Sequence, residues 1–301
     1  MAKISIIGSG YTGSLIGKWF SKFGHKVIFC DVNKNTVENL TKEGYDSTQY
    51  IKRAVEETDI SFICVPTPTA NGKIDLSYIK TVSEELGKEI KNKSEYHLVV
   101  VKSTVAPKTT EDFVKPIIEK FSGKKCGEDF GLCTNPEFLT QVNKTTKDLE
   151  LQKWYKDNPN AIKTFEEKAV IGEYDKKSGD ILEELFKNTD IPIFRTDLKT
   201  SEMIKYVHNL NLASRISYWN EIFLICNELS IDSKKVAEIV STDSRIGKYG
   251  TLHGKAFGGT CLPKDLEAFV SFCKSHNIDP KLLEAVQSIN KEMVEKHGIR
   301  E

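Results

Sequence analysis

The stretch KISIIGSGYTG (residues 3–13) decides the fold. Its short apolar run predicts a buried strand, and the GxGxxG pattern that follows predicts a tight turn into a helix. Gly8 permits the turn, Gly10 lets a phosphate approach the backbone, and Gly13 allows the helix to pack closely on the strand. The free N–H groups at the start of such a helix bind phosphate groups. The stretch therefore predicts a nucleotide-binding turn.

An acidic residue supports this interpretation. A second apolar run, residues 25–30, ends at Asp31, 18 residues after Gly13. A carboxylate at this position accepts hydrogen bonds from the ribose hydroxyls of a dinucleotide and disfavours a 2′-phosphate. The combination predicts a cofactor site rather than glycines that serve only a turn. It also predicts NAD as the cofactor rather than NADP.

Apolar runs alternate with amphipathic stretches through residue 197. Nearly continuous apolar runs are typical of parallel strands covered on both faces, and strand–helix alternation predicts an α/β fold with a doubly wound, Rossmann-type sheet. The polar stretch 140–168 predicts a partly helical excursion. Strands are expected at 3–7, 25–30, 59–65, 97–102, 129–134, 169–175 and 191–196, and helices at 12–23, 75–91, 108–121 and 177–187.

The C-terminal part is predicted to be mostly helical. An uninterrupted helical pattern runs from 200 to 230, with Met203, Val207, Leu210 and Ile216 among its apolar positions. A helix of this length spans roughly 45 Å, which indicates a connector or the spine of a dimer. Further helices are expected at 232–241, 263–275 and 280–297. We therefore expect an NAD-binding domain at 1–197 and a helical dimerisation and catalytic domain at 198–301.

Composition excludes several classes of protein. Lys plus Arg (43) equals Asp plus Glu (43), whereas a nucleic-acid binder needs an excess of cations. No signal peptide or membrane-spanning apolar run is recognisable, so no membrane partner is expected. Seven cysteines without a CxxC pair indicate reduced thiols in a soluble, cytoplasmic protein. The histidines lack ligand spacing, so no metal site is expected.

A reactive thiol is predicted in GKAFGGTCLPKD (residues 254–265). Pro263 suits the first turn of a helix, which puts Cys261 just before a helix N-terminus, with Lys264 one turn away. The partial positive charge of the helix and the ammonium group both favour a thiolate, the nucleophilic form. Asp265, four residues after the cysteine, is expected on the same face. Four other cysteines lie in apolar runs and are interpreted as core residues: Cys30, Cys64, Cys133 and Cys226.

At this point the sequence resembles the nucleotide-sugar 6-dehydrogenase family, which includes the UDP-glucose and GDP-mannose dehydrogenases. Seven ordered motifs carry the resemblance over nearly the whole chain. Besides the glycine turn and the thiol stretch they are Val65-Pro66-Thr67-Pro68, Lys102-Ser103-Thr104-Val105, Asn135-Pro136-Glu137-Phe138-Leu139, Glu202-Met203-Ile204-Lys205 through Asn209, and Asp243-Ser244-Arg245-Ile246-Gly247.

The resemblance implies a two-step oxidation of the sugar C6 alcohol to a uronic acid with two NAD+, in the supply of polysaccharide precursors. Cys261 would trap the intermediate aldehyde as a thiohemiacetal, and the second oxidation would give a thioester that water hydrolyses. Lys205 and Asn209, at i and i+4, can point at one oxygen and stabilise an oxyanion. Glu137 resembles the base for thioester hydrolysis. The implied catalytic residues are Cys261, Lys205, Asn209, Asp265, Glu137 and Thr104.

The resemblance also implies binding residues. Arg245 resembles an arginine that reaches into the neighbouring subunit's site, which implies a homodimer through the long helix. Alternatively Lys205 and Asn209 are a solvated helix face, Glu137 is a helix cap and Arg245 is a surface charge. The expected cofactor contacts are Gly8, Gly10, Tyr11, Thr12, Gly13, Asp31, Val65, Pro66, Thr67, Ser103, Thr104 and Lys264, and the expected contacts to the nucleotide-sugar substrate are Glu137, Phe138, Leu139, Lys205, Asn209, Arg245, Phe257 and Gly258.

Four features depart from the family. The sequence ends at Glu301, before the third domain of typical relatives; Gln141 stands where a second glutamate is usual; the stretch 140–168 is longer; and the stretch after Asp31 is shorter. UDP-glucose is the first candidate substrate and GDP-mannose the second. Two other functions stay open: a two-electron β-hydroxyacid-type dehydrogenase that needs no thiol, and a non-catalytic NAD-binding subunit that works with a partner chain.

Overall fold

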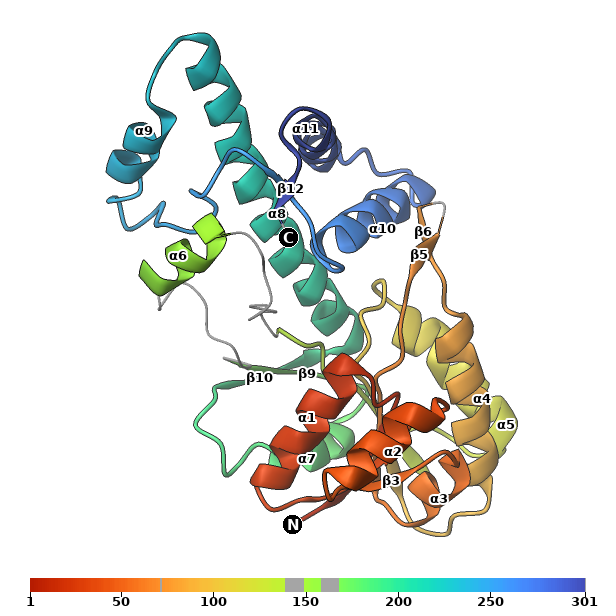
Figure 1. The fold of residues 1–301 in the computed structure, drawn as a ribbon. Coiled ribbons are helices and arrows are strands. Elements are labelled where there is room, and N and C mark those ends of the chain that lie inside the picture. The colour runs from red at the N-terminus through yellow and green to blue at the C-terminus, as the bar shows by residue number, and fades with distance from the viewer. Residues whose placement is uncertain (71, 139–148, 158–167, 301) are drawn as a thin grey trace. The chain divides into compact units, whose positions relative to one another are not determined.

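The computed structural model describes residues 1–70, 72–138, 149–157 and 168–300 (Figure 1). The chain divides into two compact units. The first unit comprises Met1–Pro68, Ile74–Phe138 and Glu166–Lys205, and the second comprises Thr69–Lys73, Leu139–Phe165 and Tyr206–Glu301.

An eight-stranded sheet forms the centre of the first unit. Its strand order is β10-β9-β8-β7-β4-β1-β2-β3. The strands from β8 to β3 in this order are parallel to one another, whereas β9 pairs antiparallel with β8 and parallel with β10. The bounds are β1 Lys3–Ile7, β2 Lys26–Cys30, β3 Asp46–Thr48, β4 Ile60–Ile63, β7 His97–Val101, β8 Phe130–Thr134, β9 Ala169–Glu173 and β10 Ile193–Asp197. The predicted Rossmann-type α/β class is confirmed.

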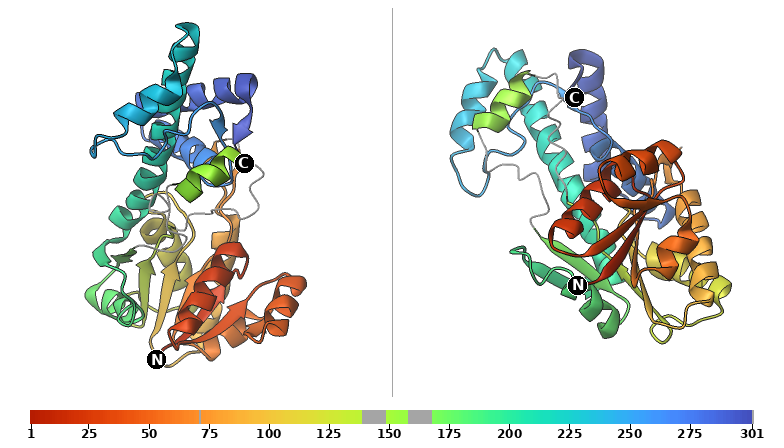
Figure 2. Two further views of the ribbon diagram at one scale, coloured as in Figure 1. Left: turned by 60° about the vertical axis from the view of Figure 1, so that its left-hand side comes forward. Right: turned by 60° about the horizontal axis from the view of Figure 1, so that its bottom comes forward.

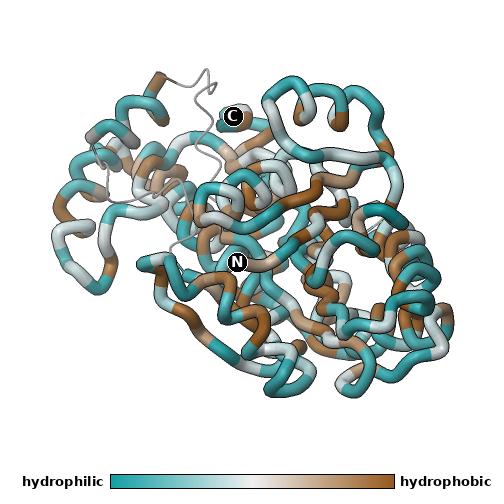
Figure 3. Tube along the Cα trace, turned by 90° about the horizontal axis from the view of Figure 1, so that it is seen from below, coloured by the Kyte–Doolittle hydropathy of each residue, from teal (hydrophilic) through white to brown (hydrophobic). Residues whose placement is uncertain are grey.

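Helices cover both faces of this sheet, which explains why its strands are apolar on both sides. On one face, α1 (Tyr11–Lys22, red in Figure 2) packs through Phe20 on Phe62 of β4, with ring centroids 5.3 Å apart. The other face has a separate apolar core that α3 (Ile51–Glu56), α4 (Ser77–Lys91) and α5 (Lys115–Ser122) share with strands β1, β2, β4, β7 and β8. Figure 3 shows hydrophobic positions recurring between hydrophilic ones along the helices, as in amphipathic helices generally.

Several details differ from the prediction. No helix or strand was predicted between Asp31 and residue 59, where the structure has α2 (Lys34–Lys42), β3 and α3. The expected helix 108–121 begins with a π-helical turn, η1 (Thr110–Val114), before α5. Of the expected excursion 140–168, residues 140–148 and 158–167 lie outside the described residues; the described part contains α6 (Leu149–Asp157) and is helical as expected.

The second unit is mostly helical. Helix α8 (Leu198–Glu228) begins in the first unit and continues into the second, where α9 (Ser233–Val240), α10 (Leu262–Ser275) and α11 (Lys281–His297) follow. Helices α10 and α11 lie side by side (Figure 1). A parallel ribbon of β11 (Ala256–Phe257) and β12 (Ile299–Arg300) and a small ribbon of β5 (Thr69–Ala70) and β6 (Lys73–Ile74) complete the described elements. Among the described residues no helix has the length and apolar character needed to span a bilayer.

A buried polar network lies inside the sheet of the first unit. The Ser61 hydroxyl is 2.8 Å from Nε2 of His97 and 2.7 Å from the Ser5 hydroxyl. The Thr58 hydroxyl donates to the Ser5 hydroxyl at 3.2 Å. Burial, together with the charge of Lys93, lowers the pKa of His97 from 6.5 to about 3. The imidazole is therefore neutral in the folded chain over the whole physiological range.

This histidine makes stability depend on pH in a defined direction. Because the pKa of His97 is lower in the folded chain than in the unfolded chain, the unfolded chain binds the extra proton between pH 6.5 and pH 3. We expect this group to reduce the free energy of unfolding by about 1.4 kcal/mol for each pH unit below 6.5. Denaturant unfolding at pH 7.5, 6.5 and 5.5 should show a smaller acid loss in His97→Gln than in the wild type. His276→Gln, at an exposed site, is the control and should follow the wild type; equal acid losses in all three proteins would contradict the prediction.

Candidate active site

The glycine turn after β1 leaves room for a ligand at one position. Gly8 has φ +92°, and a Cβ there would lie 2.8 Å from the carbonyl oxygen of Cys64. A Cβ at Gly13 would lie 2.1 Å from the carbonyl oxygen of Gly8, so these two glycines are needed for packing. Gly10, by contrast, faces open space, because a Cβ there would have no atom of the described chain beyond its immediate neighbours within 4 Å. It precedes α1, whose N-terminus has no side-chain cap, so its N–H groups fit a diphosphate.

Asp31 lies at the end of β2, where the ribose of a dinucleotide is expected. Its Oδ1 accepts a hydrogen bond from the backbone of Asn33 at 2.8 Å, and Oδ2 is left for a ligand hydroxyl. Two side chains near it along the backbone were not predicted as site residues: Val32, directly after Asp31 and 88% exposed, and the exposed Tyr50, two residues after Thr48, whose carbonyl oxygen accepts from the Asp31 N–H. Exposed apolar side chains next to a ribose-binding acid suit the faces of an adenine ring. The place of Val32 directly after the acid was the signal that could have identified it.

The expected cofactor loops after β4 and β7 lie together. The Ser103 hydroxyl donates to the carbonyl oxygens of Val65 at 2.7 Å and Ile63 at 3.2 Å. The Thr67 hydroxyl donates to the carbonyl oxygen of Thr104 at 2.8 Å. Both loops follow the carboxyl ends of neighbouring strands, next to β1, where the strand order reverses. Ligands of open α/β sheets bind at this place. Pro66, which lies between Val65 and Thr67, is exposed.

Lys205 and Glu137 form a buried pair in the first unit. The Lys205 ammonium, whose residue is 4% exposed, donates to the carbonyl oxygen of Glu137 at 2.6 Å and lies 3.3 Å from its Oε1. The ring of Phe138 lies 5.4 Å from this ammonium and 4.7 Å from that of Lys168. Lys205 is therefore not part of a solvated helix face. Lys168 was not predicted as a site residue, and its position before a strand gave no signal.

Two further buried residues hold the end of β8 and were not predicted as site residues. The ammonium of Lys102 donates to Oδ1 of Asn135 at 2.9 Å. Nδ2 of Asn135 donates to the carbonyl oxygen of Val170 at 2.8 Å. Because Asn135 lies two residues before Glu137, these bonds fix the chain that presents the Glu137 carbonyl to Lys205. Both residues lie in motifs quoted above, which was the available signal.

The thiol centre lies in the second unit. Cys261 is the N-cap residue of α10 and is half-buried, and its Sγ is 3.7 Å from the Thr260 hydroxyl. The carboxylate of Asp265, fully buried one turn later, accepts from the Lys264 ammonium at 2.6 Å and from Nδ2 of Asn209 at 2.6 Å. Asn209 is therefore bound to the first turn of α10 rather than solvated. The Thr69 hydroxyl donates to the carbonyl oxygen of Lys264 at 3.4 Å.

The remaining predicted residues have different surroundings. Phe257 is buried in β11, and its backbone pairs with the side chain of Asn290. A Cβ at Gly258 would lie 2.4 Å from the side chain of Ile299, so this glycine allows β11 and β12 to approach. Arg245 is exposed and pairs with Asp243 at 2.6 Å. Leu139 and Gln141 lie outside the described residues. Within the described ranges, no three His, Cys, Asp or Glu side chains are placed to share a metal ion.

The fold and the site together define the class. A glycine turn that opens into an uncapped helix, an acid at the end of β2 and loops at the switch point of the sheet are the parts of an NAD-binding dehydrogenase. NAD is the cofactor that this domain type binds.

Comparison with known proteins identifies the family. Residues 2–48 and 41–190 match the NAD-binding domain of the UDP-glucose/GDP-mannose dehydrogenase family, and residues 199–292 match its central domain. The chain is 37% identical to a GDP-mannose 6-dehydrogenase of Pseudomonas aeruginosa, over 98% of this chain and 69% of that protein. It is 34% identical to a UDP-glucose 6-dehydrogenase of Haloferax volcanii, over 96% and 69%. The solved structure of a UDP-glucose dehydrogenase from Pyrobaculum islandicum superposes with a TM-score of 0.86 at 32% identity, over 98% and 69%. The chain belongs to the UDP-glucose/GDP-mannose dehydrogenase family.

The open space at Gly10 generates a prediction. In Gly10→Ala the new methyl group meets no neighbouring element of the described chain, so the free energy of unfolding should change by less than about 0.5 kcal/mol. The methyl group occupies the space of the diphosphate, so NAD affinity should fall about tenfold or more. Titration calorimetry with NAD and denaturant unfolding check the two parts. Lys22→Ala, at the exposed far end of α1, should keep full affinity. Wild-type NAD affinity in Gly10→Ala would rule out this turn as the diphosphate site.

Proposed function

We propose that this chain oxidises the C6 hydroxyl of a nucleotide sugar to a carboxylate, with consumption of two NAD+. The observation that carries the proposal is Cys261 at the N-terminus of α10, half-buried and one turn from the bonded group Lys264, Asp265 and Asn209. A two-electron dehydrogenase has no use for such a thiol. UDP-glucose and GDP-mannose are the candidate substrates, since relatives of both names share about a third of their residues with this chain.

In the proposed mechanism the chain's own residues handle the substrate oxygen and the acyl group. NAD+, when bound, supplies the hydride acceptor for each oxidation. The thiolate of Cys261 adds to the aldehyde carbon and gives a thiohemiacetal, whose oxidation leaves a thioester. Glu137 takes a proton from the water that attacks the thioester, and Cys261 leaves as the thiolate. Lys205 and Asn209 donate hydrogen bonds to the oxyanion that forms in these steps, and Thr104 and Asp265 orient the hydroxyl or the water.

The proposal assigns binding roles as well. Residues 1–197 would bind NAD through the glycine turn, Asp31 and the loops after β4 and β7, with Lys264 as a further contact. Residues 198–301 would supply the thiol and the dimer contact. Glu137, Phe138, Leu139, Lys205, Asn209, Phe257 and Gly258 would surround the sugar, with Arg245 supplied by the neighbouring subunit. We place the reaction in the cytoplasm, because a catalytic thiolate needs reducing conditions.

The count of NADH formed per sugar tests the proposal against its alternatives. Purified protein is given NAD+ in excess and limiting UDP-glucose or GDP-mannose, and NADH is followed by its absorbance. Two NADH per sugar together with a uronic acid supports the proposal. One NADH per sugar favours a two-electron dehydrogenase, and NAD binding without NADH formation favours a non-catalytic subunit.

Substitution of the thiol should stop the reaction between its two oxidations. In Cys261→Ser the hydroxyl is a far weaker nucleophile, so uronic acid formation should fall by about a thousandfold or more, with NADH stopping at one per sugar. NADH absorbance and chromatographic assay of the acid measure both. Cys273→Ala, which removes a buried thiol of the same helix whose pKa burial raises, should still give two NADH. Full acid formation by Cys261→Ser would contradict the mechanism.

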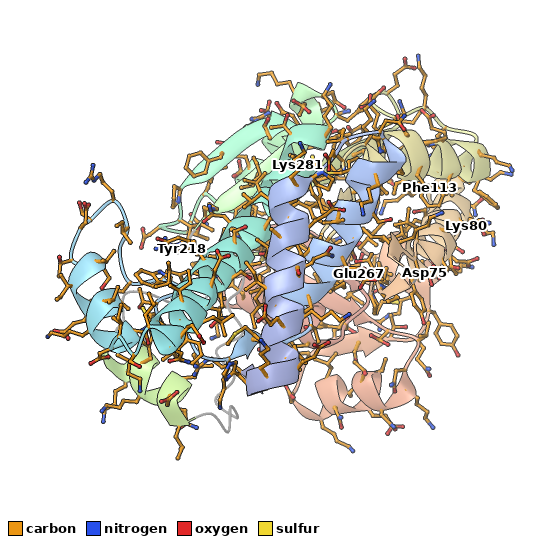
Figure 4. The ribbon with its side chains drawn as sticks, turned by 90° about the horizontal axis from the view of Figure 1, so that it is seen from above. Asp75, Lys80, Phe113, Tyr218, Glu267 and Lys281 are labelled. Atoms are coloured by element: carbon orange, nitrogen blue, oxygen red, sulfur yellow. The ribbon has the colours of Figure 1, made fainter. Side chains whose placement is uncertain are left out.

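A homodimer through α8 is part of the proposal. Exposed apolar side chains recur on one face of this helix at Tyr218 (labelled in Figure 4) and Ile225, and Leu229 follows directly after its last residue. Residues Ala213, Ser217 and Asn220, on another face, are buried in the second unit. A helix with apolar residues on more than one side buries more than one side. A second copy of the chain is the occupant we propose for the exposed face.

This face gives a prediction about mass in solution. In Ile225→Glu a charge is placed in the proposed interface, where it would be desolvated without a partner. Light scattering should find the wild type at about twice the chain mass of 34.0 kDa and Ile225→Glu at the mass of one chain. Asn227→Glu, exposed on the other side of α8, should remain a dimer. A monomeric wild type, or a dimeric Ile225→Glu, would disprove the interface.

A further inference from the structure

Glu202 is a buried acid with no role in the mechanism described above. It lies on α8 in the first unit, one turn before Lys205, and is 3% exposed. Its Oε2 accepts a hydrogen bond from the backbone N–H of Lys108 at 2.6 Å, and its Oε1 accepts from the backbone N–H of Thr110 at 2.8 Å. The carboxylate therefore binds two amides at the start of η1, about 90 residues away in the sequence.

The backbone at these amides needs such a partner. Lys108 has φ +75°, a conformation that a residue with a side chain adopts only when its surroundings hold it there. The N–H groups at the start of a helix have no acceptor within the helix. The Lys108 side chain is exposed, so the strained residue is held through its backbone. A carboxylate accepts from the two amides with separate oxygens, whereas an amide side chain offers one oxygen and places a donating NH2 group where the second oxygen was.

The same loop carries two residues of the proposed site. At its other end, Ser103 is bound to the carbonyl oxygen of Val65, and the carbonyl oxygen of Thr104 accepts from Thr67. Residues 103–110 are thus bound at one end to the cofactor loop and at the other end to α8. We propose that Glu202 is a positioning residue, whose carboxylate holds this loop, and with it Thr104, in register with the turn of α8 that carries Lys205. The inference rests on the proposed function and deepens it.

The protonation state of Glu202 makes this role measurable. Burial, with a smaller contribution from the charge of Glu111 on η1, outweighs the hydrogen bonds from Thr110 and Lys108, which lower the pKa of Glu202, and the net result is a pKa of about 7. On its own helix the nearest functional cation, Lys205, is paired with Glu137. Below pH 7 the neutral acid offers one good acceptor in place of two. Because the pKa in the folded chain is above 4.5, the folded chain takes up this proton before the unfolded chain does as the pH falls.

The test compares Glu202→Gln with Asp112→Asn. The control removes an acidic charge from the same helix start at an exposed position, and it keeps the backbone hydrogen bond from Asp112 to the carbonyl oxygen of Lys108. Amide hydrogen exchange of the peptide 103–112 is measured by mass spectrometry at pH 8. The kcat and KM for the nucleotide sugar are measured between pH 5.5 and 9 on the full chain. Glu202→Asp, which keeps the carboxylate on a shorter side chain, is the rescue variant.

We expect faster exchange of this peptide in Glu202→Gln and a fall in kcat of about ten- to hundredfold with little change in the sugar KM. The acid limb of the kcat profile near pH 7 should disappear in Glu202→Gln and return in Glu202→Asp. If Glu202→Gln does not fold, the acid limb of the kcat profile is compared among the other proteins. The proposal is supported if this limb shifts in Glu202→Asp and keeps its wild-type position in Asp112→Asn.

Either of two results in Glu202→Gln would overturn the inference: wild-type exchange and kcat, or an acid limb that persists. Equal effects in Asp112→Asn would also overturn it, because they would mean a general loss of charge at the helix start. The failure of the proposed function is a different result, namely a wild type that oxidises no nucleotide sugar. The exchange measurement then still decides whether Glu202 holds the loop.

Discussion

A buried ammonium group constrains much of the first unit. An ion removed from water must be paired and hydrogen-bonded, or the fold loses several kcal/mol. Lys205 is satisfied by both the carbonyl and the carboxylate of Glu137, so the chain after β8 must present two oxygens at one place. The bonds of Lys102 and Val170 to Asn135 hold the chain there. The bonds of Asn135 thus connect the chain after β8 to the residue after β7 and to β9, two residues before the Glu137 that pairs with Lys205.

The same requirement recurs along α8. Several polar side chains of this helix are buried, and five of them each bond to a different segment: Glu202 to the start of η1, Lys205 to Glu137, Asn209 to Asp265, Ser217 to the carbonyl oxygen of Val286, and Asn220 to Gly254 and Lys255. Such side chains are strongly destabilising when unpaired. Helix α8 thus specifies where several loops lie, in each unit separately, through polar bonds rather than through apolar packing alone.

This arrangement explains which parts could be predicted from the sequence. The glycine turn and the central strands follow local rules, because continuous apolar runs and GxGxxG each have one common structural use. On α8 the usual rule fails: Val207, one of the apolar positions of the helical pattern, is 52% exposed, whereas Lys205 is buried. Burial here depends on partners far away in sequence, such as Glu137, which no local pattern reveals. The elements α2, β3 and α3 were missed because they are short; α2 buries only Leu40.

The contacts of Lys264 change the electrostatic surroundings that the sequence predicted for Cys261. The sequence placed the Lys264 ammonium one turn from Cys261 as a charge that favours a thiolate. In the second unit that ammonium donates to Asp265, whose carboxylate largely neutralises it at short range. What remains close to the sulfur is the N-terminus of α10, where Cys261 is the capping residue and no side chain takes up the free N–H groups. The Lys264–Asp265 pair instead holds the Asn209 amide in place.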